Sequence, residues 1–99
     1  MVKHVILWKL KETDTGAKEK IKADAKRELE ALNGKIEGLI DIKIVTESLS
    51  SSNADMMLDS TFENAEALAV YQAHPLHKAA ANGYVRPFAE TRLCLDFEI

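Results

Sequence analysis

The chain has a single cysteine, Cys94, among its 99 residues. One cysteine excludes an internal disulfide framework and is typical of proteins in a reducing compartment. No apolar run approaches the roughly 20 residues that a helix needs to cross a bilayer, and the first residues lack the charged, apolar and small regions of a signal peptide. These absences predict a cytoplasmic protein with no membrane partner.

An excess of charge of one sign is also lacking. The 13 basic and 16 acidic residues are mixed along the sequence and give a formal net charge of −3. Nucleic-acid-binding domains usually carry a basic stripe, so we expect no nucleic-acid partner. The length fits one domain, expected to span residues 1–99. Because so small a domain buries only a modest core, association with a second copy would stabilise it.

Hydrophobic periodicity predicts four strands and two helices. Alternation of apolar and polar residues predicts strands over residues 2–10, 36–45, 55–62 and 89–97. Apolar residues at helical spacing predict helices over residues 17–32 and 65–72, with Asp14 or Thr15 and Asn64 as their N-caps. Residues 76–82 are expected to add one or two helical turns, ended by Gly83.

This order of elements, β-α-β-β-α-β, is typical of an α+β fold of the ferredoxin-like kind. We expect one four-stranded antiparallel sheet with both helices on the same face. The uncovered face would expose apolar residues of three strands: Val5, Leu7, Met57 and some of Leu93, Leu95 and Phe97. An apolar patch of that size predicts a partner, and the simplest partner is a second copy related by a two-fold axis.

The densest group of reactive side chains is Tyr71-Gln-Ala-His74-Pro75-Leu-His77. Pro75 has no backbone N–H and biases His74 away from helical angles, so the preceding helix should end near Ala73. Histidine titrates near neutral pH, and a tyrosine hydroxyl can donate or accept a proton. Tyr71 and His77 are therefore predicted to be a catalytic acid–base pair. The alternative is a helix end with polar residues of no catalytic role.

We expect this pair to share a cleft with the apolar face of the first strand, where His4 is the polar exception. His4 or His74 could hold an imidazole in one tautomer. Few polar groups in an apolar pocket are the usual form of a small-molecule site. The expected apolar lining from the strands and from the segment before the last strand is Ile6, Trp8, Leu58 and Phe88.

A metal site is the main chemical alternative. His74 and His77 lie three residues apart and could bind zinc together with His4. No His-x-x-x-His pair or nearby acidic ligand supports such a site, and Pro75 disrupts the helical spacing. We therefore predict that the protein needs neither a metal nor another cofactor. Cys94 is expected to be a small buried filler, because no sequence feature lowers its pKa.

Several short motifs together resemble the stress-responsive A/B barrel family of dimeric α+β barrels. They are Val2-Lys3-His4 with the run through Trp8-Lys9-Leu10, Ile36-x-Gly38-Leu39, Phe62-Glu63, Tyr71-x-x-His74-Pro75-x-His77 and Asp96-Phe97. The resemblance covers almost the whole chain, and the tyrosine–histidine motif is its most specific part. It implies the fold described above and a homodimer whose two sheets face each other as a barrel.

One member of that family is a cyclase that closes a linear polyketide by an aldol reaction without metal or cofactor. Its catalytic tyrosine and histidine match Tyr71 and His77, and both His4 and His74 also match. Where the cyclase walls its pocket with aromatic residues of the first helix, this chain offers Ala25 and Leu29. A tryptophan at the start of its last strand corresponds to Ala89. The resemblance thus implies the proton-transfer pair without the polyketide specificity.

Two classes of function follow. The first is a dimeric protein that binds a small apolar or polyketide-like ligand, with the pair serving a cofactor-independent cyclase, lyase or isomerase. The second is a non-catalytic stress-responsive or structural protein, in which Tyr71 and His77 bond each other and cap helix ends.

Overall fold

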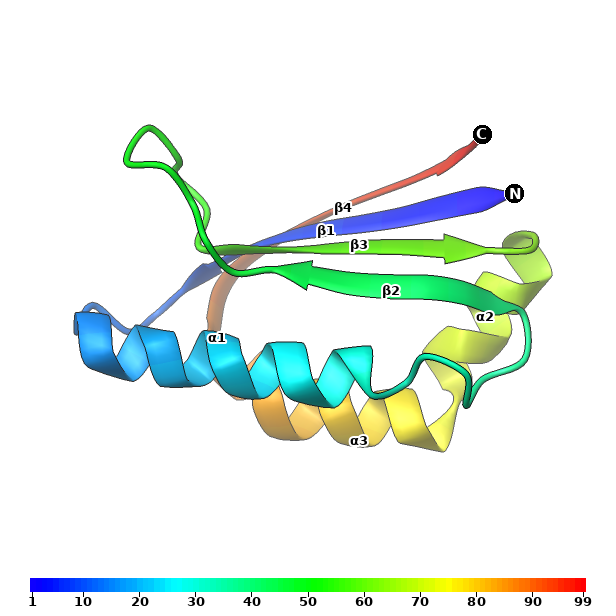
Figure 1. Ribbon diagram of the computed structural model, residues 1–99, viewed down its shortest axis with the longest axis horizontal. Coiled ribbons are helices and arrows are strands. Elements are labelled where there is room, and N and C mark those ends of the chain that lie inside the picture. The colour runs from blue at the N-terminus through cyan, green and yellow to red at the C-terminus, as the bar shows by residue number, and fades with distance from the viewer.

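Eight segments of regular structure follow one another along the chain, all 99 residues of which are described by this computed structural model. In chain order they are β1 (Val2–Leu10), α1 (Thr15–Glu30), β2 (Leu39–Val45), β3 (Met56–Phe62), α2 (Ala65–Ala73), α3 (Pro75–Tyr84), the 3-10 turn η1 (Arg86–Phe88) and β4 (Ala89–Glu98). The strands form one antiparallel sheet in the order β2-β3-β1-β4. The helices all lie against one face of it (Figure 1). The predicted ferredoxin-like α+β fold is confirmed.

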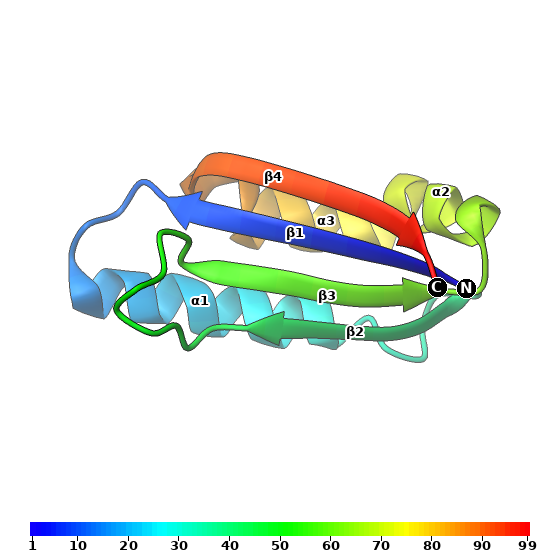
Figure 2. The same ribbon diagram turned by 90° about the horizontal axis from the view of Figure 1, so that it is seen from above.

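The N-caps of α1 and α2 are ones that the sequence predicts, although α1 lies two residues earlier than the expected 17–32. The side chain of Asp14 accepts the N–H of Ala17 at 2.9 Å, and Asn64 accepts the N–H of Ala67 at 2.8 Å. Both side chains satisfy a backbone donor that the first helical turn leaves without an intrahelical partner. From above, α1 lies beneath β2 and β3, whereas α2 and α3 lie towards β1 and β4 (Figure 2).

Two further predicted boundaries are wrong. The second strand begins at Leu39 rather than at residue 36, because Gly38 turns the chain with a φ of +84°. A Cβ atom at Gly38 would lie 2.5 Å from the Cβ of Ala67, so the turn also passes close to α2. Only glycine combines this φ with this approach at low cost.

The second wrong boundary concerns the segment after the proline. It is a ten-residue helix, α3, and Gly83 lies inside it. Pro75 occupies the first turn, where a missing N–H costs no hydrogen bond. His74 caps that turn, its Nδ1 accepting the N–H of Leu76 at 3.1 Å. The proline therefore ends one helix and begins another.

The core lies between the sheet and the helices. The even-numbered residues of β1 face inward and are all buried, as predicted. In the register of the sheet, His4 stands opposite Ser60 on one side and Asp96 on the other. This row of polar residues crosses the inner face of an otherwise apolar sheet.

The other face of the sheet carries no helix (Figures 1 and 2). Large apolar side chains are exposed on it: Leu7 is 39% exposed, Leu93 64%, Leu95 65% and Phe97 42%. Leu93 pairs directly with Leu7 across the two strands. None of the three helices is long and apolar enough to cross a membrane.

Candidate functional site

The first component of the site is His4, which β1 carries into the space between sheet and helices. Its side chain is 1% exposed, and Nδ1 is hydrogen-bonded to a carboxylate oxygen of Asp96. Partial burial works to raise the pKa of Asp96, but the hydrogen bonds with His4 and Cys94 and the nearby positive charges together outweigh it, and the pKa is lowered. An ionised carboxylate can only accept, so Nδ1 of His4 carries the proton. Nε2 remains as the acceptor of the ring and forms no hydrogen bond within the chain.

The second component is the ring pair formed by Tyr71 and His77. Tyr71 lies on the buried face of α2, and the turn at His74-Pro75 brings α3 back so that the two ring centroids are 4.2 Å apart. The Tyr71 ring also lies 4.9 Å from the ring of Phe62 and 6.4 Å from that of His4. The structure therefore brings Tyr71, His77 and His4 close to one another.

Two polar atoms of the ring pair are buried without a hydrogen-bond partner in the chain: the hydroxyl of Tyr71 and Nδ1 of His77. Burial raises the pKa of Tyr71 well above its usual range. Burial also lowers the pKa of His77 to about 4, and the positive charges of Arg86 and Arg92 contribute to this shift. At neutral pH the pair is therefore a phenol, which can donate, beside a neutral imidazole, which can accept.

A cleft of about 110 Å³ opens beside this pair. It is lined by residues of β1, α2, α3, η1 and β4: His4, Ile6, Trp8, Gln72, His77, Ala81, Val85, Arg86 and Arg92. The structure thus places four of the predicted residues around this cleft: His4, Ile6, Trp8 and His77. Tyr71 is not itself a wall residue. It is 0% exposed and lies against the ring of His77.

The other predicted lining residues lie elsewhere. Ala25, Leu29 and Leu58 are packed in the hydrophobic core, because the apolar sides of α1 and β3 meet each other there. Phe88 lines a separate hollow beside α1, since η1 turns it away from the cleft. His74 does not support the pair either, because its Nδ1 accepts the backbone N–H of Leu76 in α3.

Besides Ala81 and Val85, four polar residues of the site were missed: Asp96, Gln72, Arg86 and Arg92. The alternation of the last strand had placed Arg92 and Asp96 on the same face. That face could have been assigned to the helix side, because the apolar residues of β4 face the other way. The contact between His4 and Asp96 depends on strand register and carries no sequence signal of its own.

The structure does not assemble the three histidines considered as a zinc site. The ligand-type atoms that do come together belong to His4, Cys94 and Asp96, all within 4.8 Å of one another. Partial burial and, to a smaller extent, the hydrogen bond to Asp96 raise the pKa of the Cys94 thiol. This favours the thiol over the thiolate that binds metals. Cys94 is exposed rather than buried, contrary to expectation.

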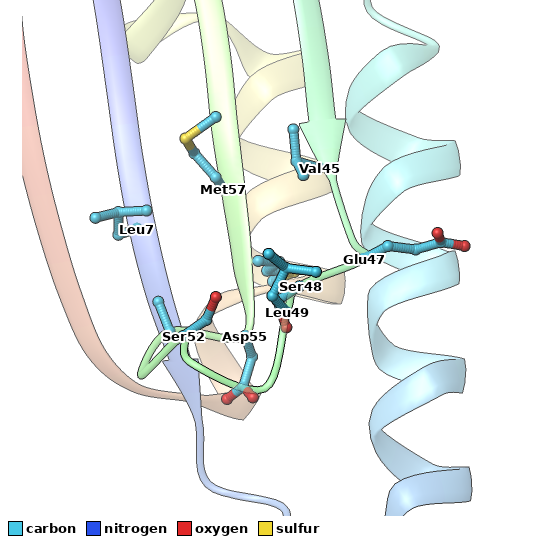
Figure 3. Close-up of a pocket in the computed structure, with 10 residues that line it drawn as sticks. Leu7, Val45, Glu47, Ser48, Leu49, Ser52, Asp55 and Met57 are labelled. Carbon is cyan, nitrogen blue, oxygen red and sulfur yellow. The ribbon is translucent and has the colours of Figure 1, made fainter.

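A larger hollow, of about 310 Å³, lies on the helix-free face beside the connection between β2 and β3 (Figure 3). Leu7, Val45 and Met57 form its floor, and Leu49 of the connecting loop overhangs it. Of its two carboxylates, Asp55 is engaged by the N–H of Leu10 and by Lys18, and Glu47 lies in the connecting loop. It offers no pair of groups for proton transfer, so the cleft at His77 is the better candidate for chemistry.

A helix-covered antiparallel sheet with a polar cleft between the two layers defines a ferredoxin-like α+β protein. Within that class the chain belongs to the stress-responsive A/B barrel domain family, whose profile, Stress responsive A/B Barrel Domain, matches residues 2–99. No curated protein matches the chain at a significant level.

Solved structures agree with this assignment. A dimeric protein of unknown function from Bacteroides fragilis is 29% identical and superposes with a TM-score of 0.91, over 99% of this chain and 95% of that one. A protein from Arabidopsis thaliana is 25% identical, with a TM-score of 0.74, over 100% and 95%. A dimeric ferredoxin-like protein of unknown function from Thermobifida fusca is 21% identical, with a TM-score of 0.82, over 99% and 90%, and supports the fold alone.

Proposed function

We propose that the protein is a homodimer in which each subunit binds a small molecule and acts on it by cofactor-independent acid–base chemistry of the cyclase, lyase or isomerase type. One observation carries the proposal: a phenol and a neutral imidazole lie in contact beside a cleft, and the hydroxyl and Nδ1, both buried, have no partner in the chain. A buried polar group without a hydrogen bond costs about 1–3 kcal/mol. The presence of two such groups side by side is best explained by a ligand that forms hydrogen bonds with them.

The chemistry begins with proton removal next to a carbonyl group. The neutral imidazole of His77 takes the proton from carbon, and the electron pair of the C–H bond passes into an enolate. Tyr71, still protonated, donates a hydrogen bond to the enolate oxygen. In a cyclase the enolate carbon then bonds to a second carbonyl carbon, whose oxygen receives the proton from His77. In an isomerase the same proton returns to a different carbon.

Access to Tyr71 requires a small movement. Its hydroxyl is covered in the free protein, and the ring of His77 lies against it. We infer that the imidazole rotates when a ligand enters, which side chains do rapidly. His4 stays fixed by Asp96 and presents Nε2 to the cleft as a second acceptor, able to orient a substrate hydroxyl.

The dimer follows from the helix-free face. Its exposed leucines and Phe97 form an apolar surface that a second copy would bury. The Bacteroides fragilis relative, at 29% identity, is described as dimeric. We propose that the two sheets pack face to face, so that the hollow beneath Leu49 lies at the rim of the interface and the cleft at His77 remains on the helix side of each subunit.

Deuterium exchange tests the chemistry without knowledge of the natural substrate. Small ketones and oxo acids are incubated with the protein in D2O, and loss of the proton next to the carbonyl is followed by NMR. The wild-type protein should accelerate exchange for at least one compound. His77→Ala should abolish the acceleration, and Tyr71→Phe should reduce it about 10²-fold or more.

His74→Ala is the matched control, because it removes a neighbouring histidine that caps α3 and does not line the cleft. Acceleration that survives in His77→Ala, or that falls equally in His74→Ala, would exclude His77 as the base.

A further inference from the structure

The cleft carries positive charge that proton transfer alone does not require. Arg86 and Arg92 are both wall residues, and none of the nine lining residues is acidic. Arg86 follows α3 in the chain, whereas Arg92 lies on the inner side of β4 opposite Trp8. The two guanidinium groups therefore reach the cleft from its helix side and from its sheet side.

Neither arginine is used up by a carboxylate. Arg86 donates to the side-chain oxygen of Asn82 at 2.6 Å, and no ion pair of the chain includes Arg86 or Arg92. The charge of Arg92 acts on Asp96, but the two side chains form no ion pair, and Oδ1 of Asp96 is hydrogen-bonded to His4. An arginine has five N–H donors in a planar fork that matches a carboxylate. Most of those donors stay available to a ligand.

The protein thus maintains two cations beside the imidazole of His77. Their positive charge disfavours protonation of that ring. An incoming anion would relieve this unfavourable field and would be attracted by it. Negative charge next to His77 also favours its protonated form, so an anionic ligand would strengthen the base that is to act on it. The charges of the cleft and its proposed chemistry agree on the same class of ligand.

We propose that the cleft binds a small organic carboxylate, held by Arg92 and Arg86, with its carbonyl group directed at His77. This inference rests on the proposed function for the position of the reacting group, whereas the carboxylate site stands on the arginines. The cleft is small, with a volume of about 110 Å³. An oxo acid of a few carbons fits that space, and a long-chain acid does not.

Trp8 provides a built-in probe, since it is the only tryptophan, is 5% exposed and lines the cleft. Levulinate, a stable five-carbon oxo acid, is titrated against the dimeric protein while Trp8 fluorescence is recorded. Its amide, of nearly the same shape and without charge, is titrated in parallel. Levulinate should bind saturably and at least about tenfold more tightly than the amide, which corresponds to about 1.4 kcal/mol.

Arg92→Gln removes the charge from an exposed position of β4 and should fold. It should weaken levulinate binding about tenfold and leave the amide unchanged, and Arg92→Lys should lie between the two because it keeps the charge without the fork. Lys35→Gln removes one positive charge from an exposed site outside the cleft and should change neither titration. Equal binding of acid and amide, absence of saturable levulinate binding, or an Arg92→Gln protein with unaltered affinity would each overturn the carboxylate site.

The carboxylate site and the proposed acid–base function can be refuted independently of each other. Levulinate binding that depends on Arg92, without any exchange of its protons in D2O, would leave the carboxylate site intact and refute the acid–base role. Exchange of neutral ketones that depends on His77, without levulinate binding that depends on Arg92, would do the reverse.

Discussion

Replacing Tyr71 by phenylalanine should make the protein more stable. The hydroxyl of Tyr71 is buried without a partner, so the folded state loses the hydrogen bonds that water gives this group in the unfolded chain. The substitution keeps the ring and its packing against Phe62 and His77. An unsatisfied buried hydroxyl costs about 1–3 kcal/mol, and the small void left by one oxygen takes back part of the gain. We expect the free energy of unfolding to rise by about 1 kcal/mol.

Urea denaturation followed by Trp8 fluorescence measures this change, at one fixed protein concentration because a dimer's stability depends on it. In a thermal scan the same change should raise Tm by about 4–8 °C. Tyr84→Phe is the matched control: the other tyrosine, at the end of α3, is partly exposed and should change stability by less than about 0.5 kcal/mol. A Tyr71→Phe protein destabilised by about 1 kcal/mol or more would mean that the hydroxyl is satisfied in the folded protein and has a structural role.

Three further predictions follow from the site and the helix-free face. The pKa of His77 is lowered from 6.5 to about 4, so the unfolded chain takes up the proton at a higher pH than the folded protein does. The free energy of unfolding should therefore fall as the pH falls from about 6.5 towards 4. His77→Gln should flatten this part of the curve of unfolding free energy against pH. Asp96→Ala leaves Nδ1 of buried His4 with only the sulfur of Cys94, 3.6 Å away, as a partner and should cost about 1–3 kcal/mol in urea denaturation, whereas a neutral effect would deny the structural value of the hydrogen bond to Asp96. Leu93→Asp should give monomers or unfolded protein in sedimentation. Val70→Asp should remain dimeric, because Val70 is an exposed residue of α2 outside the helix-free face. A wild-type chain that sediments as a monomer would refute the dimer.

Much of the fold could be read from the sequence because its signals are local. Alternation fixes the inner face of β1, and Asp14 and Asn64 mark two helix starts through side chains that lie next to the backbone they cap. The helix after Pro75 was underestimated because the proline was interpreted only as a helix stop. The same residue is favourable in a first turn, and His74 supplies the cap.

The site was predictable as far as its residues lie close in sequence. Tyr71 and His77 are six residues apart, and a proline-enforced turn between two helices is enough to bring their rings together. Asp96 is 92 residues from His4, and only the register of β1 with β4 makes them neighbours. Arg92 reaches the cleft through the same register. Such contacts are fixed by tertiary pairing, which no local pattern encodes.

Proton removal by His77 from a ligand bound in this cleft can be measured as the rate at which levulinate in D2O loses the protons next to its carbonyl group, compared between His77→Ala and His74→Ala. We predict that His74→Ala retains the wild-type rate while His77→Ala falls to the rate of buffer alone. Equal rates in the two variants would contradict proton removal by His77.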